Sequence, residues 1–268
     1  MTKFSEFKNL FDITGKVAVV TGAGSGIGQG IAYAFAASGG KVVCTDINAT
    51  ALRETVDEIR RNNGEVHSVR ADCTEVADVR RIRDDSLKVF GRIDALYAIP
   101  GINVRKKIED YSYDEFDRVV NLNLKGTFIL MKEIGSEIAK NKEGGSIVVM
   151  SSIRNVLVEP GQSAYAATKA AVAMLAKVQA AELGKSNVRV NALAPGYVDT
   201  PLVRQIKKDI EWYKASREKN ALKRWAQVRE IAGPAIFLAS AAASHITGAV
   251  IYVDGGWTAV DGRYEPKL

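Results

Sequence analysis

A glycine-rich turn lies between an apolar strand and an apolar helix near the start of the chain, an order that few folds accommodate. Residues 16–21 form a β-branched run, the turn follows at residues 22–28, and a second strand at residues 41–45 ends at Asp46. Glycines let the backbone approach a pyrophosphate, and a helix N-terminus offers it unpaired N–H groups. An acid about twenty residues after the turn can accept hydrogen bonds from a ribose. The segment therefore predicts a dinucleotide-binding unit.

The same acid bears on which dinucleotide binds. The charge of Asp46 would repel the 2′-phosphate of NADP, and no Arg or Lys lies inside the turn or directly after Asp46 to offset it. The sequence therefore favours NAD over NADP.

Strands and helices continue to alternate along the rest of the chain. Further strands are predicted at 65–71, 95–98, 147–150, 188–194 and 249–253, and helices at 49–61, 75–90, 114–140, around Tyr165 and at 230–240. Leu124, Phe128 and Met131 are expected on the apolar side of the 114–140 helix. Regular alternation implies a parallel sheet covered on both faces. We predict an α/β single-domain Rossmann fold with a doubly wound parallel sheet of about seven strands and helices on both faces.

No linker, repeat or low-complexity segment divides the chain. A single domain is therefore expected over residues 15–256, with a substrate lid at 199–225 inside it. A leader at residues 1–14 carries Phe4, Phe7, Leu10 and Phe11 at roughly helical spacing and is expected to dock on the body. Residues 257–268 form a tail beyond the last strand.

The composition, 47% hydrophobic and 25% charged, is typical of a soluble globular protein. No apolar run reaches the roughly 18 residues that a membrane-spanning helix needs, and the N-terminus lacks the apolar region of a signal peptide. Cys44 and Cys73 show no metal-ligand spacing. We expect a cytoplasmic protein with reduced thiols, without a metal site and without a membrane partner.

A second stretch carries candidate acid–base chemistry. The strand at 147–150 ends in Ser151 and Ser152, and an Ala-rich helix follows in which Tyr165 and Lys169 share one face because they are four residues apart. A fixed ammonium beside a phenol lowers the pKa of the phenol. A hydroxyl at the end of the strand could polarise a carbonyl. The stretch predicts proton transfer at an alcohol or carbonyl.

Taken together, these motifs resemble the short-chain dehydrogenase/reductase family, in register from residue 21 to residue 256. The turn resembles the family's coenzyme loop, and residues 254–256 resemble its C-terminal signature. The resemblance implies a catalytic tetrad of Asn123, Ser152, Tyr165 and Lys169. The implied cofactor contacts are Gly22, Ser25, Gly26, Ile27, Gly28, Asp46, Ile47, Asp72, Cys73, Pro100, Gly101, Tyr165, Lys169, Pro195, Gly196, Val198 and Thr200.

The family's chemistry gives each member of the tetrad an expected role. The resemblance implies an NAD(H)-dependent oxidoreductase that interconverts a secondary alcohol and a ketone, or a sugar lactol and a lactone. Tyr165 would exchange the alcohol proton, Lys169 would hold the Tyr165 pKa down and bind the nicotinamide ribose, and Ser152 would contact the substrate oxygen. Asn123 would hold a water that relays protons. The resemblance also implies a homotetramer with the 114–140 and 165–182 helices in its subunit contacts.

One segment departs from the family pattern. The family usually shows Asn-Asn-Ala-Gly after the fourth strand, where this chain has Ala98-Ile99-Pro100-Gly101. The replacement is apolar but keeps the glycine. We therefore expect the fine positioning of the cofactor to change and the reaction to stay the same.

Substrate residues are expected after the strands and in the lid. Residues 203–224 carry eight Lys or Arg against three acids, either to attract an anionic substrate or as a solvated helix face. Trp212, Tyr213 and Trp225 could instead line an apolar pocket. Arg154 could contact a carboxylate or polyol or be an ion-pair partner, and Arg105 has the same ambiguity. The predicted substrate contacts are Ser152, Arg154, Tyr165 and Trp212.

Several functions remain open on these residues. A sugar, sugar-acid or polyol dehydrogenase is the preferred interpretation, and a reductase for bulky hydrophobic ketones and diketones or for 3-oxoacyl thioesters is the alternative. A non-catalytic NAD-binding regulator would not need the complete tetrad. Only the basic stretch and the pI suggest a nucleic-acid partner, and the chain shows no known nucleic-acid-binding motif. A small-molecule substrate is therefore expected.

Overall fold

A seven-stranded sheet forms the centre of the molecule in the computed structural model, which describes residues 7–261. The strands are all parallel and lie in the order β3-β2-β1-β4-β5-β6-β7. They span Val17–Thr21 (β1), Lys41–Asp46 (β2), Val66–Arg70 (β3), Ala95–Ala98 (β4), Gly145–Met150 (β5), Val188–Pro195 (β6) and Val250–Val253 (β7). The predicted Rossmann fold is confirmed.

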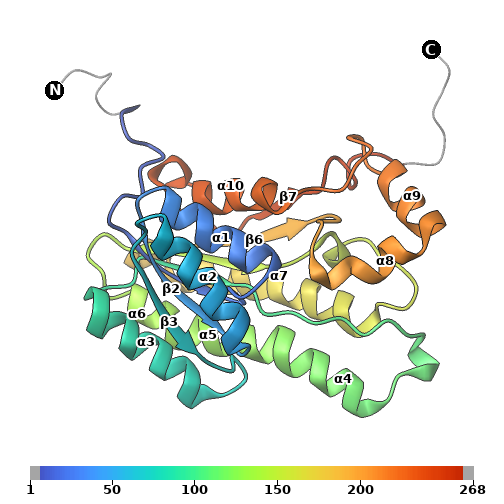
Figure 1. Ribbon diagram of the computed structural model, residues 1–268, viewed down its shortest axis with the longest axis horizontal. Helices are drawn as coiled ribbons and strands as arrows, with labels where there is room; N and C mark the ends of the chain where they lie inside the picture. Colours follow the sequence, from blue (N-terminus) through green and yellow to red (C-terminus); the bar gives the residue numbers. More distant parts are fainter. Residues whose placement is uncertain (1–6, 262–268) are drawn as a thin grey trace.

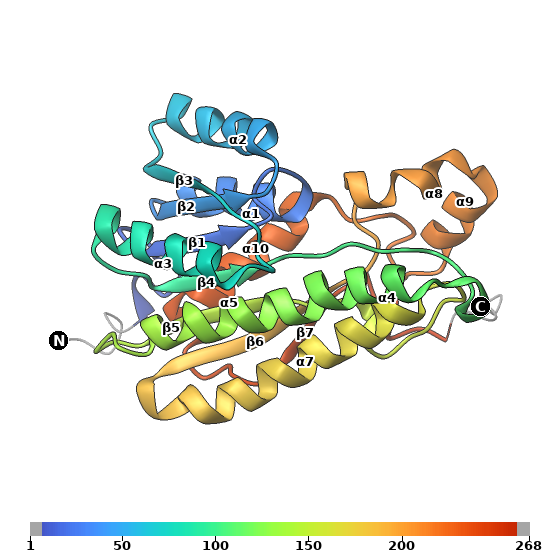
Figure 2. The same ribbon diagram turned by 90° about the horizontal axis from the view of Figure 1, so that it is seen from below.

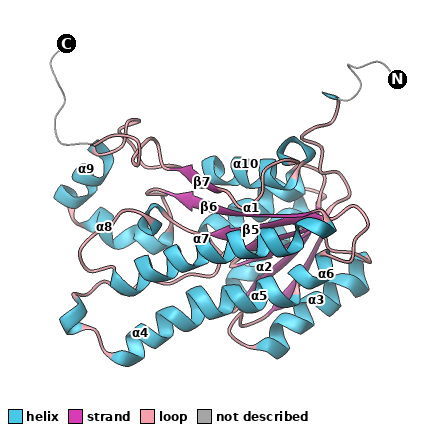
Figure 3. Cartoon of the chain, turned by 180° about the vertical axis from the view of Figure 1, so that it is seen from behind, coloured by secondary structure: helices cyan, strands magenta, loops and turns pink. Residues whose placement is uncertain are grey.

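Helices cover both faces of this sheet (Figures 1 and 3). One buried core lies between the sheet and α1, α2 and α10, and the other lies between the sheet and α3, α5 and α7. The helices span Gly26–Ala37 (α1), Ala49–Arg61 (α2), Val76–Phe90 (α3), Tyr113–Val120 (α4), Thr127–Glu133 (α5), Gly135–Ile138 (α6), Ser163–Leu183 (α7), Arg204–Lys208 (α8), Ile210–Glu218 (α9) and Val228–Ala239 (α10).

Local sequence explains where these elements begin and end. Every residue of β1 and β4 is buried, as expected for central strands of a parallel sheet with both faces covered. The Asn48 side chain accepts hydrogen bonds from the first N–H groups of α2. Gly91 ends α3 in the left-handed conformation at φ 77°. The chain order reverses between β1 and β4, and in such sheets ligands bind where the carboxyl ends of the strands diverge.

The helix predicted over 114–140 differs from a uniform α-helix. A π-helical segment, Asn121–Gly126 (η3), separates α4 from α5. Met131 is buried as expected, but Phe128 is 50% exposed, so its expected place on the apolar side was wrong. The wider π turn changes the angular position of the residues around it, which an α-helical period of 3.6 residues does not anticipate.

The predicted lid begins after β6 and includes α8 and α9. Figure 2 shows these two helices side by side at one end of the molecule, beyond the main body of the sheet. A separate buried cluster holds the lid to the body; its members are Ile153, Tyr197, Ile206, Trp225 and Trp257.

The ends of the predicted leader and tail, residues 1–6 and 262–268, lie outside the described residues, and with them Phe4. Within the described part, Leu10 accepts a hydrogen bond from the Ala242 N–H at 2.8 Å, and the Phe11 ring lies 6.2 Å from that of Phe237. Phe7 is exposed. Between residues 7 and 261, no helix has both the length and the apolar character to cross a membrane.

Candidate active site

A cleft of about 670 Å³ opens at the carboxyl ends of the strands. All the residues predicted to bind the cofactor line it, from the glycine turn to Thr200. Ser152, Tyr165 and Lys169 line the same cleft at its inner end. The structure therefore brings the cofactor set and three members of the predicted tetrad into a single cavity, although they are spread over about 180 residues of sequence.

The glycine turn leaves room and donors for a phosphate group. Gly22 and Gly26 take φ of 65° and 55°, values in the left-handed region that glycine adopts at no steric cost. A methyl group on Gly28 would lie 2.2 Å from the Gly22 carbonyl oxygen, so glycine is needed for the turn to close. Helix α1 follows, and the side chain of its N-cap Ser25 makes no capping bond. Its first N–H groups can therefore bind an anion.

Asp46 lies at the end of β2 and already accepts two backbone hydrogen bonds, from Gly24 at 3.0 Å and from Asn48 at 2.8 Å. These donors orient its carboxylate at the cleft wall. Arg70 is its partner in the β2–β3 register and donates to the Ile47 carbonyl oxygen at 3.2 Å. Strand pairing thus places a cation near Asp46 that the local sequence around Asp46 does not reveal. The anion-binding turn and this acid together fit a dinucleotide.

Ser152 and Tyr165 come from the end of β5 and the start of α7, which pack together. The Ser151 hydroxyl donates to the Lys169 carbonyl oxygen at 2.8 Å and joins the two elements. The Ser152 hydroxyl accepts from the Arg154 N–H at 3.2 Å. Lys169 is buried, and its Nζ donates to the Met150 carbonyl oxygen at 2.8 Å.

The electrostatics of Tyr165 differ from the sequence expectation. Burial raises the pKa of its phenol above 10, while a hydrogen bond with Ser152 and the charges of Arg154 and Arg105 lower the pKa. Lys169 lies over the face of the phenol ring, with Nζ 5.5 Å from the centroid. Burial also lowers the pKa of Lys169 to about 8. Arg154 and Arg105 are therefore two further cations that lower the pKa of Tyr165, and the sequence analysis did not assign them this effect.

Asn123 lies in the π-helical segment and is buried. Its Oδ1 accepts from the Ile102 N–H at 2.8 Å, and its Nδ2 donates to the Ile102 carbonyl and to Thr168 Oγ1. A methyl group on Gly101 would lie 3.4 Å from Lys169 Nζ. The Asn123 side chain thus fixes the segment after β4 next to Lys169, and its polar atoms are occupied by these bonds.

The apolar segment after β4 is braced by a different residue. Thr21 Oγ1 donates to the Tyr97 carbonyl oxygen at 3.2 Å and accepts from the Ile99 N–H at 2.9 Å. The hydroxyl therefore joins β1 to the end of β4, where Ala98 has no polar side chain to contribute. Pro100 and Gly101 follow this anchor and line the cleft.

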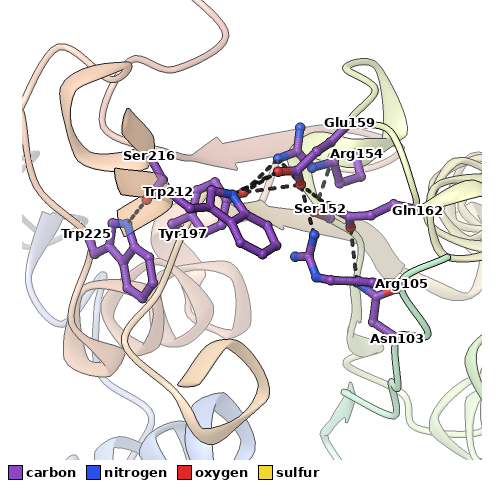
Figure 4. Close-up of polar contacts among 10 residues, drawn as sticks. All are labelled: Asn103, Arg105, Ser152, Arg154, Glu159, Gln162, Tyr197, Trp212, Ser216 and Trp225. Carbon is purple, nitrogen blue, oxygen red and sulfur yellow. Dashed lines mark hydrogen bonds and ion pairs between the residues drawn. The ribbon is translucent and has the colours of Figure 1, made fainter. Parts of the chain in front are cut away.

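A second, smaller pocket of about 60 Å³ shares Ser152 and Tyr165 with the main cleft. Arg105 and Arg154 line it, and no acidic residue does. Glu159 lies beside the two arginines, and Figure 4 shows the surrounding side chains converging on its carboxylate. The donors to Glu159 are Arg105, Arg154, Gln162, Tyr197 and Trp212. Sequence analysis missed Glu159, whose only signal was its place in a loop between Ser152 and Tyr165.

Two predicted substrate contacts have different surroundings. Arg154 is only 7% exposed, lines the small pocket and pairs with Glu159 at 2.9 Å, so it is both a pocket residue and an ion-pair partner. Trp212 lines neither cavity within the described chain; its Nε1 donates to Glu159 at 3.2 Å. Trp225 is buried against Tyr197, with ring centroids 5.3 Å apart, and does not form an apolar substrate wall.

The basic side chains of residues 203–224 also lie away from the two cavities. The lid contributes Thr200, Pro201, Leu202 and Val203 to the lining, but none of its lysines or arginines. Lys207 pairs with Asp199 at 2.6 Å and Arg224 with Glu230 at 2.6 Å. The charge run therefore forms a solvated face, the second of its two interpretations.

Comparison with known proteins agrees with this geometry. A family model described as enoyl-(acyl carrier protein) reductase matches residues 22–258. The sheet order, the glycine turn and the cleft define a dinucleotide-dependent oxidoreductase that acts on CH–OH groups. The chain belongs to the short-chain dehydrogenase/reductase family, which confirms the resemblance drawn from its motifs.

Three relatives illustrate the range of named activities. The 2-dehydro-3-deoxy-D-gluconate 5-dehydrogenase of Dickeya dadantii is 32% identical over 251 residues, covering 94% of this chain and 98% of that enzyme. The 3-oxoacyl-(acyl-carrier-protein) reductase of Thermotoga maritima is 35% identical over 244 residues, covering 91% and 98%. The crystal structure of a gluconate 5-dehydrogenase from Burkholderia cenocepacia, in complex with NADP and tartrate, matches with a TM-score of 0.90 at 32% identity, covering 94% and 98%.

Proposed function

We propose that this protein is an NAD-dependent dehydrogenase of sugar acids or related polyols, acting on a secondary alcohol. The observation that carries the proposal is the small pocket beside Ser152 and Tyr165, which is lined by two arginines and no acid. Guanidinium groups bind carboxylates with paired N–H donors. Relatives named for sugar-acid substrates support the same class.

Each residue of the tetrad takes a role from its contacts. Tyr165 exchanges the proton of the substrate alcohol, and Ser152, which hydrogen-bonds with Tyr165, contacts the same oxygen. Lys169, with a pKa lowered to about 8, passes protons onward near neutral pH, and it lines the cleft, where it would bind the nicotinamide ribose. Asn123 positions the segment after β4 beside Lys169. Bound nicotinamide supplies the hydride chemistry, for which the protein provides position and charge.

Asp46 supports NAD as the cofactor. Its carboxylate lies at the cleft wall, where it can accept hydrogen bonds from the adenosine ribose and repel a 2′-phosphate. NADP is the second candidate, because relatives have been crystallised with NADP and because Arg70 lies near Asp46.

A substrate panel tests the function. Initial rates of NAD⁺ reduction and NADH oxidation are measured with sugar acids, polyols, aryl ketones and diketones, and the series is repeated with NADP(H). Turnover of sugar acids with NAD is the expected result. Preference for apolar ketones would contradict the substrate class, and activity with NADP(H) alone would contradict the role of Asp46.

We also propose a homotetramer acting in the cytoplasm. Helices α4 and α7 pack side by side (Figure 2), and the exposed apolar side chains Tyr113, Phe116, Phe128, Met174 and Val178 lie on α4, α5 and α7. Such a patch supports a subunit contact. Cys44 and Cys73 are unpaired, as in reducing compartments. Light scattering should give four chains, and Phe128→Asp should lower that mass; a monomeric wild type would contradict the assembly.

A further inference from the structure

We propose that Arg105 and Arg154 form a subsite for a single substrate carboxylate, and that Glu159 sets the charge of this subsite and positions both arginines. The inference rests on the proposed function and specifies which substrates the site selects. Arg105 follows β4, whereas Arg154 and Glu159 both lie in the connection between β5 and α7, so two separate segments meet at this point (Figure 4).

The size of the pocket suits one small group. Its volume is about 60 Å³, several times the roughly 10–15 Å³ that one water requires. A carboxylate fits such a space. Because the pocket shares Ser152 and Tyr165 with the cleft, a carboxylate held there keeps the rest of the molecule next to those hydroxyls.

The arginines retain donors for a ligand. Arg154 contacts Glu159 and the Tyr197 hydroxyl through Nη2 alone, and Arg105 contacts Glu159 through Nη1 alone. A guanidinium has five N–H donors, so most of them have no hydrogen-bond partner among the described residues. Glu159 itself is not part of the pocket lining. The arginines therefore present to the pocket the donors that Glu159 leaves unused.

Glu159 supplies the charge balance. Arg154 is 7% exposed, and a charge so deeply buried requires a counterion. One carboxylate shared by two guanidiniums leaves one net positive charge, which one substrate carboxylate neutralises. A neutral polyol leaves that charge uncompensated. The cluster is therefore matched to substrates that place one carboxylate in the pocket.

Other contacts fix the arginines and tie the lid to the cluster. The Arg105 guanidinium lies 4.8 Å from the centre of the Trp212 ring, and Trp212 Nε1 donates to Glu159. Arg154 lies 5.7 Å from the centre of the Tyr197 ring. Stacking of this kind holds a guanidinium plane in place, so Trp212 acts through Arg105 and Glu159.

The test compares three substrates with one carbon skeleton: D-glucitol, D-gluconate and D-glucarate, which carry no, one and two carboxylates. Arg105→Gln should raise KM for D-gluconate by roughly 10- to 100-fold, the effect of one lost charge-assisted contact, and leave KM for D-glucitol near its wild-type value. Because the Arg105 charge also lowers the pKa of Tyr165, any change in kcat should be the same for both substrates. Arg105→Lys should recover part of the loss. Lys208→Gln removes the same charge from the exposed lid surface and is the control. Glu159→Gln, which removes the carboxylate shared by Arg105 and Arg154, should change KM for D-gluconate and D-glucarate and leave KM for D-glucitol near its wild-type value.

The outcomes separate this inference from the proposed function. One outcome is that the wild type oxidises sugar acids while Arg105→Gln keeps the wild-type KM for D-gluconate, or raises KM for D-glucitol and D-gluconate equally. In either case the proposed subsite is wrong and the proposed function stands. If the wild type turns over only neutral ketones, D-gluconate is tested as a competitive inhibitor of the holoenzyme. Inhibition relieved by Arg105→Gln supports the subsite without the function, and absence of inhibition overturns the subsite. Melting temperatures show whether each variant is folded.

Discussion

The Nζ atom of Lys169 donates a hydrogen bond to the carbonyl oxygen of Met150 at 2.8 Å inside the protein. The bond satisfies the amine, but burial still lowers the pKa of Lys169 from 10.5 to about 8. A shift of this size corresponds to about 3 kcal/mol of stability lost at neutral pH. The group that the site needs for proton transfer therefore weakens the fold.

Lys169→Met should stabilise the protein without cofactor at pH 7 by about 2 kcal/mol, since the lost bond to Met150 offsets about 1 kcal/mol of the gain. The unfolded state holds the Lys169 proton more tightly than the folded state, so wild-type stability rises with pH between about 8 and 10.5. The difference between the two proteins should close over that window. Urea unfolding at pH 7 and pH 10 checks this; a variant less stable at pH 7 would contradict it.

Tyr165→Phe should lower turnover by roughly 10²- to 10⁴-fold, because it removes the group that exchanges the substrate proton. The ring and its contact with Lys169 remain, so NADH affinity should stay within about threefold of wild type, a free-energy change under 1 kcal/mol. Steady-state rates and a fluorescence titration with NADH give both quantities. Tyr252→Phe, a substitution outside both cavities, is the control. Near-normal turnover in Tyr165→Phe would contradict the assignment of Tyr165 as the group that exchanges the substrate proton.

Asp46→Asn should weaken NAD binding by roughly 10- to 100-fold, since hydrogen bonds to a charged acceptor contribute about 1.5–3 kcal/mol. Removing the negative charge beside Arg70 should also raise activity with NADP. Adding Arg70→Gln in this background should reverse the gain. Glu54→Gln removes an equal charge from the exposed face of α2, and it should change neither NAD binding nor the activity with NADP. The ratio of kcat/KM for the two cofactors is the measurement.

Gly28→Ala should destabilise the protein by more than about 2 kcal/mol and abolish NAD binding, because the added methyl group would lie 2.2 Å from the Gly22 carbonyl oxygen. Gly233→Ala in α10 is the matched change, because no atom lies within 4 Å of the new methyl group. Gly233→Ala should therefore raise the free energy of unfolding by about 0.5–1 kcal/mol. Thermal unfolding distinguishes the two, and equal stability of both variants would refute the prediction.

Local sequence predicted most of the fold and the main cleft. The β-branched runs, the glycine turn and Asp46 act over short spans of chain, where periodicity and turn chemistry determine structure. Phe128 was misplaced because an extra residue in a helical turn leaves no mark in hydrophobic spacing. The alternation of strands and helices then set the sheet order and brought the strand ends together.

What the sequence could not show depends on contacts between distant segments. Arg70 approaches Asp46 only because β3 pairs with β2. Glu159 gains two of its donors, Arg105 and Trp212, from the segment after β4 and from α9, and no spacing within its own loop indicates them. For the same reason the sequence did not show that Arg105 and Arg154, which come from separate loops, lower the pKa of Tyr165.

The π-helical segment Asn121–Gly126 fixes the length of the helix that contains it. An α-helix turns by 100° per residue, so deleting or inserting one residue there would rotate everything beyond it by that angle. Either Asn123 would lose its hydrogen bond with Ile102, or Met131 would no longer be buried in the core. Single substitutions along this helix can be tolerated, but a change in its number of residues cannot. Homologous chains that keep the cleft should therefore place their insertions and deletions outside it.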